Sequence, residues 1–150
     1  MTRTAEPRPR TRVAAYALIE RGERVLLCRI SAQIPTLAGC WTLPGGGLEF
    51  GEDPADAVVR EVREETGLAV EPTGLVDADS RLLESGREPR RCLHHLRLLY
   101  RARILGGELR AEVDGTTDRC AWHTLEEARE LPAVSLLGVG LGWIERARGG

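Results

Sequence analysis

The chain has 150 residues, of which 42% are hydrophobic and 29% charged, so it has the length of one domain and the composition of an ordinary globular protein. These proportions exclude an intrinsically disordered chain and a membrane-spanning one. The formal net charge of −2 gives no sign of a protein that binds nucleic acid. All 21 strongly basic residues are arginines, which we interpret as a coding bias because it extends along the whole chain.

The N-terminus, MTRTAEPRPRT, is basic and contains proline, and we expect a disordered segment over 1–11 followed by a single domain over 12–150. No apolar stretch is long enough for a signal peptide or for the ~18 residues of a membrane span. The four cysteines form no C-x-x-C pair, and the three histidines have no zinc-type spacing. We therefore expect free thiols, a cytoplasmic location and no membrane partner.

The first third of the chain is predicted to be extended. Two apolar runs at 12–19 and 24–30 flank a turn-like segment at 20–23, which predicts a β-hairpin. After a loop, Trp41–Leu43 is predicted to be a short strand. The Pro-Gly-Gly-Gly sequence at 44–47 predicts a loop.

The segment from Asp53 to Gly67 predicts a helix. Asp53 is suited to the N-cap, Pro54 to the first helical position, and Gly67 to the C-terminal stop. Residues at helical spacing predict a buried stripe made of Ala55, Val58, Val59, Val62 and Thr66.

The second half is predicted to alternate irregularly between strands and helices. We expect an extended stretch at 68–83, a polar loop at 84–91, strands at 92–104 and 119–124, and helices at 125–130 and 135–148. This order indicates an α/β or α+β domain with a mixed sheet.

Three carboxylates in the predicted helix lie within an arc of about 100° on one face, because Glu61, Glu64 and Glu65 are spaced at i, i+3 and i+4. Such a cluster is ordinarily a solvated acidic surface. Here it adjoins the buried stripe, and a glycine-rich segment runs into the same helix. Hard oxygen ligands beside a glycine-rich backbone suit Mg²⁺ or Mn²⁺ together with a phosphate.

The acidic residues are concentrated around this helix. Residues 49–65 hold seven acids and two arginines, and the rest of the chain is mildly basic. A local acidic patch in such a protein suits a metal that accompanies an anionic substrate.

The sequence Gly46-x5-Glu52-x7-Arg60-Glu61-Val62-x-Glu64-Glu65-x-Gly67-Leu68 resembles the Nudix box, G-x5-E-x7-R-E-U-x-E-E-x-G-U with U aliphatic, and matches every fixed position. The preceding Trp41–Gly45 is similar to the usual lead-in of that family. The resemblance implies an α/β fold, an α/β/α sandwich around a mixed sheet. It also implies metal-dependent hydrolysis of a nucleoside diphosphate linked to another group.

The resemblance also implies roles for the residues of the box. Arg60 would hold the helix carboxylates by a salt bridge, and Glu52 would brace the loop or orient a ligand. Glu61 is our first candidate for the general base and Glu64 the second. The implied metal contacts are the carbonyl of Gly45 and the side chains of Glu61, Glu64 and Glu65.

Residues outside the box carry weaker signals. Some family members use a further acid from a distant loop, for which Glu112, Asp114 and Asp118 are candidates, but a turn is the favoured interpretation of this Asp-Gly segment. Arg29 and Trp41 are weak candidates for substrate contacts.

Two adjacent histidines begin the strand at 92–104. Alternation predicts that one of His94 and His95 points inward and the other outward. We interpret the inward one as structural or as lying at the edge of the site.

The leading hypothesis is a metal-dependent pyrophosphohydrolase that cleaves a small-molecule substrate, either a nucleoside diphosphate-X or a (d)NTP, with no nucleic-acid partner. The alternatives are a Nudix-fold module that binds a ligand without hydrolysis and an isomerase of isoprenoid diphosphates on the same fold. Dimers are common in the family, so a homodimer stays open as the oligomeric state.

Overall fold

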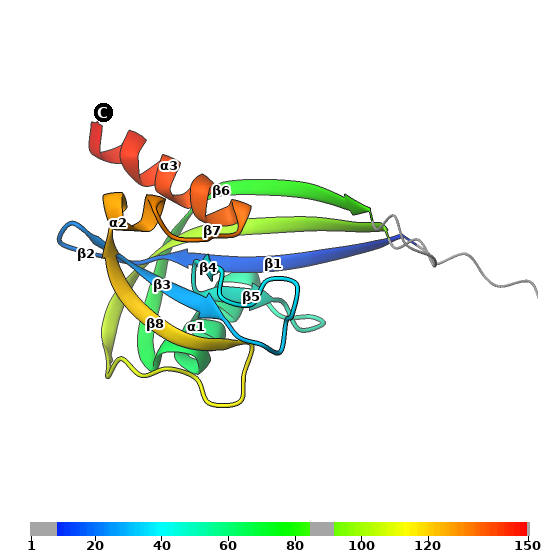
Figure 1. Cartoon of the computed structure of the whole chain (residues 1–150), viewed down its shortest axis with the longest axis horizontal. Coiled ribbons are helices and arrows are strands. Elements are labelled where there is room, and N and C mark those ends of the chain that lie inside the picture. Colours follow the sequence, from blue (N-terminus) through cyan, green and yellow to red (C-terminus); the bar gives the residue numbers. More distant parts are fainter. Residues whose placement is uncertain (1–8, 85–91, 150) are drawn as a thin grey trace, which may run out of the picture.

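The computed structural model describes residues 9–84 and 92–149. In these ranges the elements are β1 (Arg10–Leu18), β2 (Glu20–Arg21), β3 (Arg24–Ile30), β4 (Trp41–Thr42), β5 (Gly45–Gly47), α1 (Pro54–Thr66), β6 (Leu68–Glu84), β7 (Cys92–Gly107), β8 (Thr117–Thr124), α2 (Leu125–Arg129) and α3 (Ser135–Gly149). Figure 1 shows the strands in the middle of the molecule, with α3 on one side and α1 on the other.

The strands form two four-stranded sheets. The first has the order β5-β1-β7-β6, with β1 parallel to β7 and the other pairs antiparallel, so this sheet is mixed as predicted. In the second sheet β3 is central and pairs with β2, β4 and β8.

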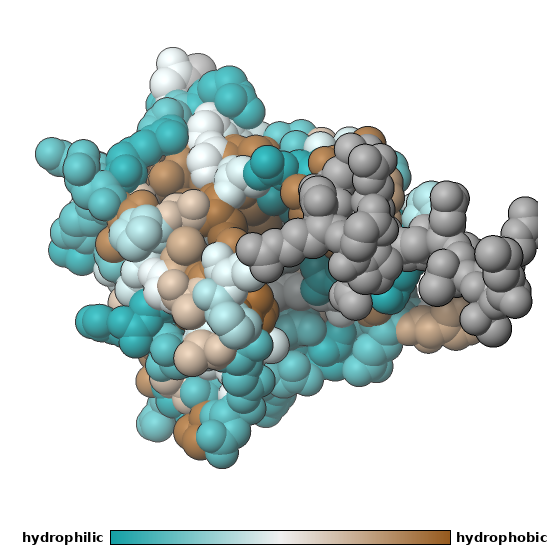
Figure 2. Space-filling view, turned by 45° about the vertical axis from the view of Figure 1, so that its right-hand side comes forward, coloured by the Kyte–Doolittle hydropathy of each residue, from teal (hydrophilic) through white to brown (hydrophobic). Residues whose placement is uncertain are grey.

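Successive side chains of β1 enter two different cores, which explains the layered arrangement. Ala14, Tyr16 and Leu18 pack in one apolar cluster with α3, whereas Ala15 and Ala17 pack in another with α1. Helices therefore cover both faces of the first sheet, and the predicted α/β/α sandwich is confirmed. In Figure 2 hydrophobic side chains gather in the middle of one face of the molecule, with hydrophilic residues around them.

The predicted hairpin between 12–19 and 24–30 is confirmed only next to its turn, where β2 pairs antiparallel with β3 and the Leu26 amide donates to the Ile19 carbonyl. It is wrong for the rest of the first run, because β1 and β3 lie in different sheets. The chain leaves the first sheet at Ile19, and the two-residue strand β2 turns back onto β3 at Gly22, which has a φ of +58°. Both faces of β1 are covered, so its apolar run carries no alternation that would indicate which sheet it joins.

The predicted loop at 44–47 is also wrong for its three glycines, which form β5 and pair antiparallel with β1. The strand approaches β1 so closely that a Cβ atom on Gly45 would lie 2.3 Å from the carbonyl oxygen of Ala15. Glycine is a poor strand former in general, but here its missing side chain permits this contact.

Helix α1 has the predicted boundaries. The carboxylate of Asp53 accepts a hydrogen bond from the Ala55 amide at 2.9 Å, Pro54 is the first residue, and Gly67 ends the helix with a φ of +76°. The buried face is turned slightly from the predicted stripe, because Ala57 and Glu65 are buried, whereas Ala55 and Val59 are only partly covered.

The remaining predicted elements are confirmed within a few residues. β7 extends to Gly107, β8 begins at Thr117, and both C-terminal helices are present. β1 already includes residues 10 and 11, and the rest of the expected disordered segment up to residue 8 lies outside the described residues, as does the predicted polar loop beyond residue 84.

Two further expectations concern the cysteines and membranes. All four cysteines are free thiols, as predicted. Within residues 9–84 and 92–149, no helix has the length and apolar character needed to cross a membrane.

Candidate active site

Strand β5 lies against the carboxylate face of α1. The Gly45 amide donates a hydrogen bond to a carboxylate oxygen of Glu65 at 3.2 Å. A Cβ atom on Gly46 would lie only 2.8 Å from the carboxyl carbon of Glu61. The glycines therefore let the helix carboxylates approach the strand backbone to a distance that no other residue type permits.

Arg60 joins the loop before α1 to the helix carboxylates. Its guanidinium donates to both carboxylate oxygens of Glu52, at 2.8 and 2.9 Å, and to Glu61 at 2.9 Å. It also donates to the carbonyl of Gly47 at 3.2 Å and lies 3.6 Å from Glu64. The hydrogen bonds from Arg60 and from the Glu49 amide lower the pKa of Glu52 to about 2. This arrangement agrees with the bracing roles expected for Arg60 and Glu52.

Glu61 and Glu65 are two carboxyl groups in a confined space. Glu65 is 3% exposed, and its pKa is well above the usual value because of burial and then the charge of Glu61. Burial also raises the pKa of Glu61, against the effect of Arg60. Two buried carboxyls that repel one another need a shared proton or a cation to remain together.

The donor set fits a hard divalent cation, because it consists of carboxylate oxygens beside a strand backbone. Within the described part of the chain, however, no three acidic, histidine or cysteine side chains form a ready-made metal cluster. Glu61 is engaged by Arg60, and the side chain of Glu64 is 51% exposed. A bound cation would have to draw these two carboxylates together with Glu65.

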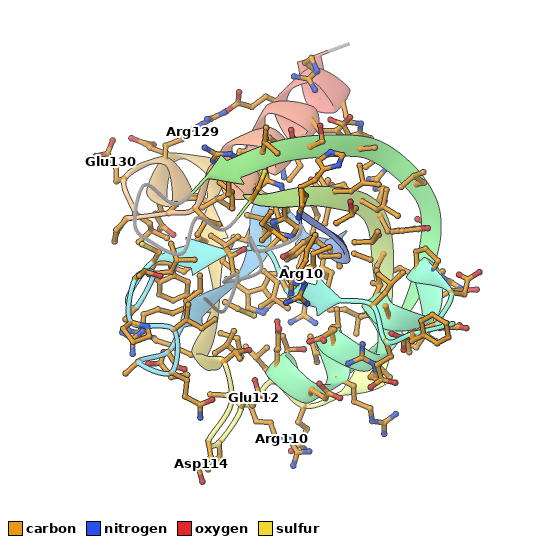
Figure 3. The ribbon with its side chains drawn as sticks, turned by 90° about the vertical axis from the view of Figure 1, so that its right-hand side faces the viewer. Arg10, Arg110, Glu112, Asp114, Arg129 and Glu130 are labelled. Carbon is orange, nitrogen blue, oxygen red and sulfur yellow. The ribbon has the colours of Figure 1, made fainter. Side chains whose placement is uncertain are left out.

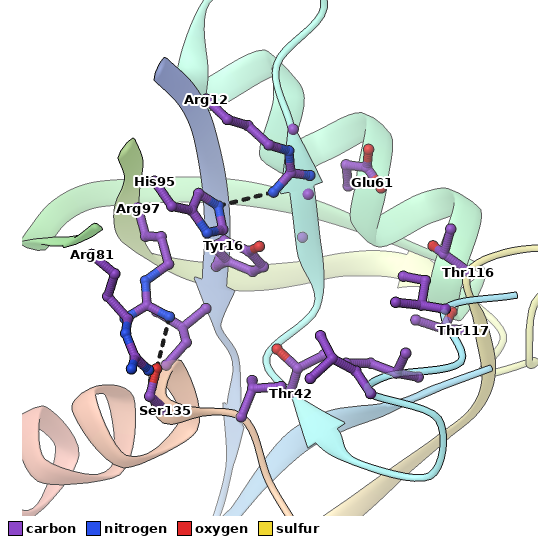
Figure 4. Close-up of a pocket in the computed structure, with 18 of the residues that line it drawn as sticks. Arg12, Tyr16, Thr42, Glu61, Arg81, His95, Arg97, Thr116, Thr117 and Ser135 are labelled. Atoms are coloured by element: carbon purple, nitrogen blue, oxygen red, sulfur yellow. Dashed lines mark hydrogen bonds between the residues drawn. The ribbon is translucent and has the colours of Figure 1, made fainter. Parts of the chain in front are cut away.

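A cavity of about 460 Å³ opens beside these carboxylates (Figure 4). Glu61, Glu65 and the three glycines of β5 form part of its lining. Another part is apolar and comes mainly from the loop after β3 and from the start of α3; its residues are Ile30, Ile34, Leu37, Val134 and Leu136. The cavity thus offers carboxylates, backbone and an apolar surface to one ligand.

The cavity also has a basic wall, which we define as Arg12, Arg81, His95 and Arg97. Sequence reasoning missed its arginines, since 21 arginines are spread over the chain. The alternation rule does place His95 and Arg97 on one face of β7, and His95 lines the cavity while His94 is exposed. This confirms that one histidine points inward. Burial, together with Arg12 and Arg97, lowers the pKa of His95 to about 4.

The two weak substrate candidates lie outside the lining of this cavity. Arg29 donates to the carboxylate of Asp118 at 2.8 Å. The Trp41 ring is 6% exposed, belongs to a core cluster and meets the His123 ring edge-on at 4.8 Å. These contacts favour structural roles for both residues.

The distant acids line a separate hollow of about 260 Å³ together with Ser31 and Gln33. Glu112 accepts a hydrogen bond from the Thr117 hydroxyl at 3.1 Å. Asp114 has a φ of +55° and points away from the body of the protein in Figure 3. This geometry agrees with the turn interpretation, and Glu112 and Asp114 take no part in the lining of the larger cavity.

Comparison with known proteins gives one family. A family model of the NUDIX domain matches residues 8–137. The ADP-ribose pyrophosphatase of Methanocaldococcus jannaschii is 37% identical over 102 residues, which cover 68% of this chain and 56% of that protein. The NAD-capped RNA hydrolase NudC of Pseudomonas aeruginosa is 33% identical over 125 residues, which cover 83% of this chain and 40% of that protein. The chain thus spans about half the length of these curated relatives.

Solved structures agree with the family match. The crystal structure of a MutT NUDIX hydrolase from Burkholderia pseudomallei superposes with a TM-score of 0.67 at 28% identity, covering 89% of this chain and 98% of that one. A MutT protein from Methanosarcina mazei has a TM-score of 0.72 at 21% identity, covering 99% of this chain and 100% of that one, and shows the shared fold.

Proposed function

Because this chain belongs to the Nudix family, we propose that it hydrolyses a phosphoanhydride bond of a nucleoside diphosphate-X or (d)NTP with Mg²⁺ or Mn²⁺. The observation that carries the proposal is the pair of confined carboxyls, Glu61 and Glu65, on the lining of the 460 Å³ cavity. The relatives named for ADP-ribose and for NAD-capped RNA support a substrate in which a diphosphate links a nucleoside to a second group.

The residues that would hold the cation are those implied by the resemblance to the family: Glu61, Glu64, Glu65 and the carbonyl of Gly45. A divalent cation bound there shields the diphosphate and stabilises the charge that develops on the leaving oxygen. Arg60 keeps Glu61 directed at β5 through its 2.9 Å hydrogen bond, and Glu52 holds Arg60 in turn through two hydrogen bonds.

Glu61 is the favoured general base over Glu64. Glu61 lies on the cavity lining beside Gly46, where it can accept a proton from a water that attacks a bound diphosphate. Glu64 is half-exposed and lies outside that lining.

The apolar part of the lining suits a nucleobase. Ile34 and Leu37 from the loop after β3 and Leu136 from the start of α3 line the same cavity. A flat base buried between aliphatic side chains gains about 25 cal/mol for each Å² of apolar surface removed from water. Arg29 and Trp41 are not needed for this contact.

The proposal is tested by incubating the full chain with a panel of phosphoanhydrides and either Mg²⁺ or Mn²⁺. The panel contains dNTPs, ADP-ribose, a nucleotide sugar, a dinucleoside polyphosphate and NAD-capped RNA, and released phosphate is measured with and without added pyrophosphatase. We expect cleavage of a small-molecule member by the wild type and a loss of at least about 100-fold in Glu64→Gln.

The alternatives give different outcomes in the same assay. Equal inactivity of wild type and Glu64→Gln on every member, with a nucleotide still bound, would support a non-catalytic sensor and contradict the proposal. Conversion of isopentenyl diphosphate without phosphate release would support an isomerase. Cleavage of the capped RNA alone would overturn the prediction of a small-molecule substrate.

Location and assembly are part of the same proposal. Free thiols and nucleotide substrates suit the cytoplasm, where thiols are kept reduced. Light scattering of the purified chain distinguishes the monomer from the homodimer.

A further inference from the structure

The basic wall of the cavity is assembled by strand register. On β1, Arg12 and Ala14 lie beside His95 and Arg97 of the parallel strand β7. On β6, Arg81 lies beside His95. Residues paired in register share one face of a sheet, so three neighbouring strands present these basic side chains together.

The wall carries more positive than negative charge. Arg97 forms an ion pair with Asp79. Among the described residues, Asp79 is the one acidic residue that forms an ion pair with an arginine of the wall. Arg12 donates its hydrogen bond to the ring Nε2 of His95 at 2.9 Å, so His95 accepts in its neutral form. Three guanidinium groups and one carboxylate leave an excess of positive charge facing the cavity.

Arg97 has a hydrogen-bond donor that is not used within the described residues. Its side chain is 6% exposed, yet its Nε atom has no acceptor among the described residues. A buried guanidinium with an unpaired donor is costly unless an acceptor arrives. Its Nη1 donates to the Ser135 hydroxyl at 3.1 Å, and Ser135 is the first residue of the 15-residue helix α3. The N-terminus of that helix adds its own partial positive charge.

The position of the wall separates it from the carboxylates of α1. On β5, a Cβ atom at Gly46 would meet Glu61, whereas one at Gly47 would lie 3.0 Å from the guanidinium of Arg12. Figure 4 shows Arg81, His95, Arg97 and Ser135 on one side of β5 and Glu61 on the other.

We propose that the basic wall binds a second anionic group of the substrate, a phosphate or a carboxylate on the part of the molecule beyond the scissile diphosphate. This inference rests on the proposed function and narrows its substrate class. A diphosphate bound at Glu61 and Glu65 would lie across β5 from Arg81 and Arg97, so the Nε atom of Arg97 would still lack an acceptor. An additional oxyanion satisfies Arg12, Arg81 and Arg97 with charge-assisted hydrogen bonds.

Matched substrate pairs test the inference by kinetics. UDP-glucuronate and UDP-glucose differ in one carboxylate, and ADP-ribose 2′-phosphate and ADP-ribose differ in one phosphate. We expect the anionic member of one pair to have a kcat/KM about tenfold higher or more in the wild type, and the pair that shows the effect identifies the group. Arg12→Gln should lower the kcat/KM of the anionic member about tenfold more than that of the neutral one.

The control is Arg103→Gln, which removes an exposed arginine of β7, the strand that carries His95 and Arg97; Arg103 pairs with Glu71 away from the cavity. Arg103→Gln should keep the wild-type ratio of kcat/KM between the anionic and the neutral member of the pair. The inference is wrong if the two members of each pair have the same kcat/KM in the wild type. It is also wrong if Arg12→Gln lowers the kcat/KM of both members equally, because the wall would then hold the diphosphate itself.

A binding measurement separates this inference from the proposed function. Inorganic phosphate is titrated onto the full chain in EDTA by calorimetry. Binding that Arg12→Gln weakens at least about fivefold, and that Arg103→Gln leaves unchanged, supports the basic wall even if no phosphoanhydride is cleaved. Absence of binding to the wild type, or equal binding to wild type and Arg12→Gln, overturns the inference even if the protein is an active hydrolase.

Discussion

Gly46→Ala should lower activity with little effect on folding. The new Cβ atom would lie 2.8 Å from the carboxyl carbon of Glu61, about 0.6 Å inside an ordinary van der Waals contact of 3.4 Å. The atom it meets is the end of a flexible side chain, so the carboxyl can rotate away at small cost. Glu61 then loses its place against β5 and its 2.9 Å hydrogen bond from Arg60.

A displacement of this size is large for a catalytic group. Misplacement by about 1 Å costs up to roughly 100-fold in rate, so we expect kcat/KM to fall between about 10- and 100-fold. Urea unfolding of the same samples should show a free energy of unfolding within about 1 kcal/mol of the wild type.

Gly138→Ala is the matched control for this substitution. Gly138 lies in α3, and a Cβ atom there would meet nothing within 4 Å. Alanine in a helix is more stable than glycine by about 0.5–1 kcal/mol, so this variant should gain stability and keep its kcat/KM. A Gly46→Ala variant with wild-type kcat/KM would refute the reasoning that the glycine exists to seat Glu61.

Three further predictions follow from single contacts. Arg60→Gln should lower kcat/KM by at least about 100-fold, because Glu52 and Glu61 both lose their common donor, and Arg63→Gln on the exposed face should not. Asp53→Ala removes the N-cap of α1 and should lower the free energy of unfolding by about 1 kcal/mol in a urea titration. The pKa of His95 is lowered from 6.5 to about 4, so between these pH values the unfolded chain binds more protons than the folded one, and the free energy of unfolding should fall as the pH drops from 6.5 to 4. His95→Gln should flatten this part of the curve of stability against pH. An unchanged slope would contradict the lowered pKa of His95.

The elements that sequence predicts well are those fixed by neighbouring residues. Helix α1 is the clearest case, since its cap at Asp53, its first residue Pro54 and its stop at Gly67 act within one or two turns of the backbone. The spacing of Glu61, Glu64 and Glu65 likewise places them on one face without knowledge of the rest of the fold. The local sequence therefore predicted both the helix and the common face of its three carboxylates.

The errors arise where distant segments decide the structure. β1 is apolar on both faces, so its sequence could not show that it pairs with β7 rather than with β3. The glycines of β5 were predicted to form a loop, because glycine favours a strand only where other segments, here α1 and β1, pack closely against its backbone. The basic wall requires the register of β1, β6 and β7, which brings Arg12 and Arg97 together across more than eighty residues of sequence.

The central claim, that water attacks a phosphoanhydride in the cavity beside Glu61 and Glu65, is tested most directly with isotope-labelled water. The full chain is incubated with Mg²⁺ and the best substrate of the panel in H₂¹⁸O, and the products are analysed by mass spectrometry. We predict that a single ¹⁸O atom enters one product phosphate per cleavage, and that Glu61→Gln lowers the rate of this labelling at least about 100-fold. Full binding of the nucleotide without any labelled product from the wild type would contradict the account.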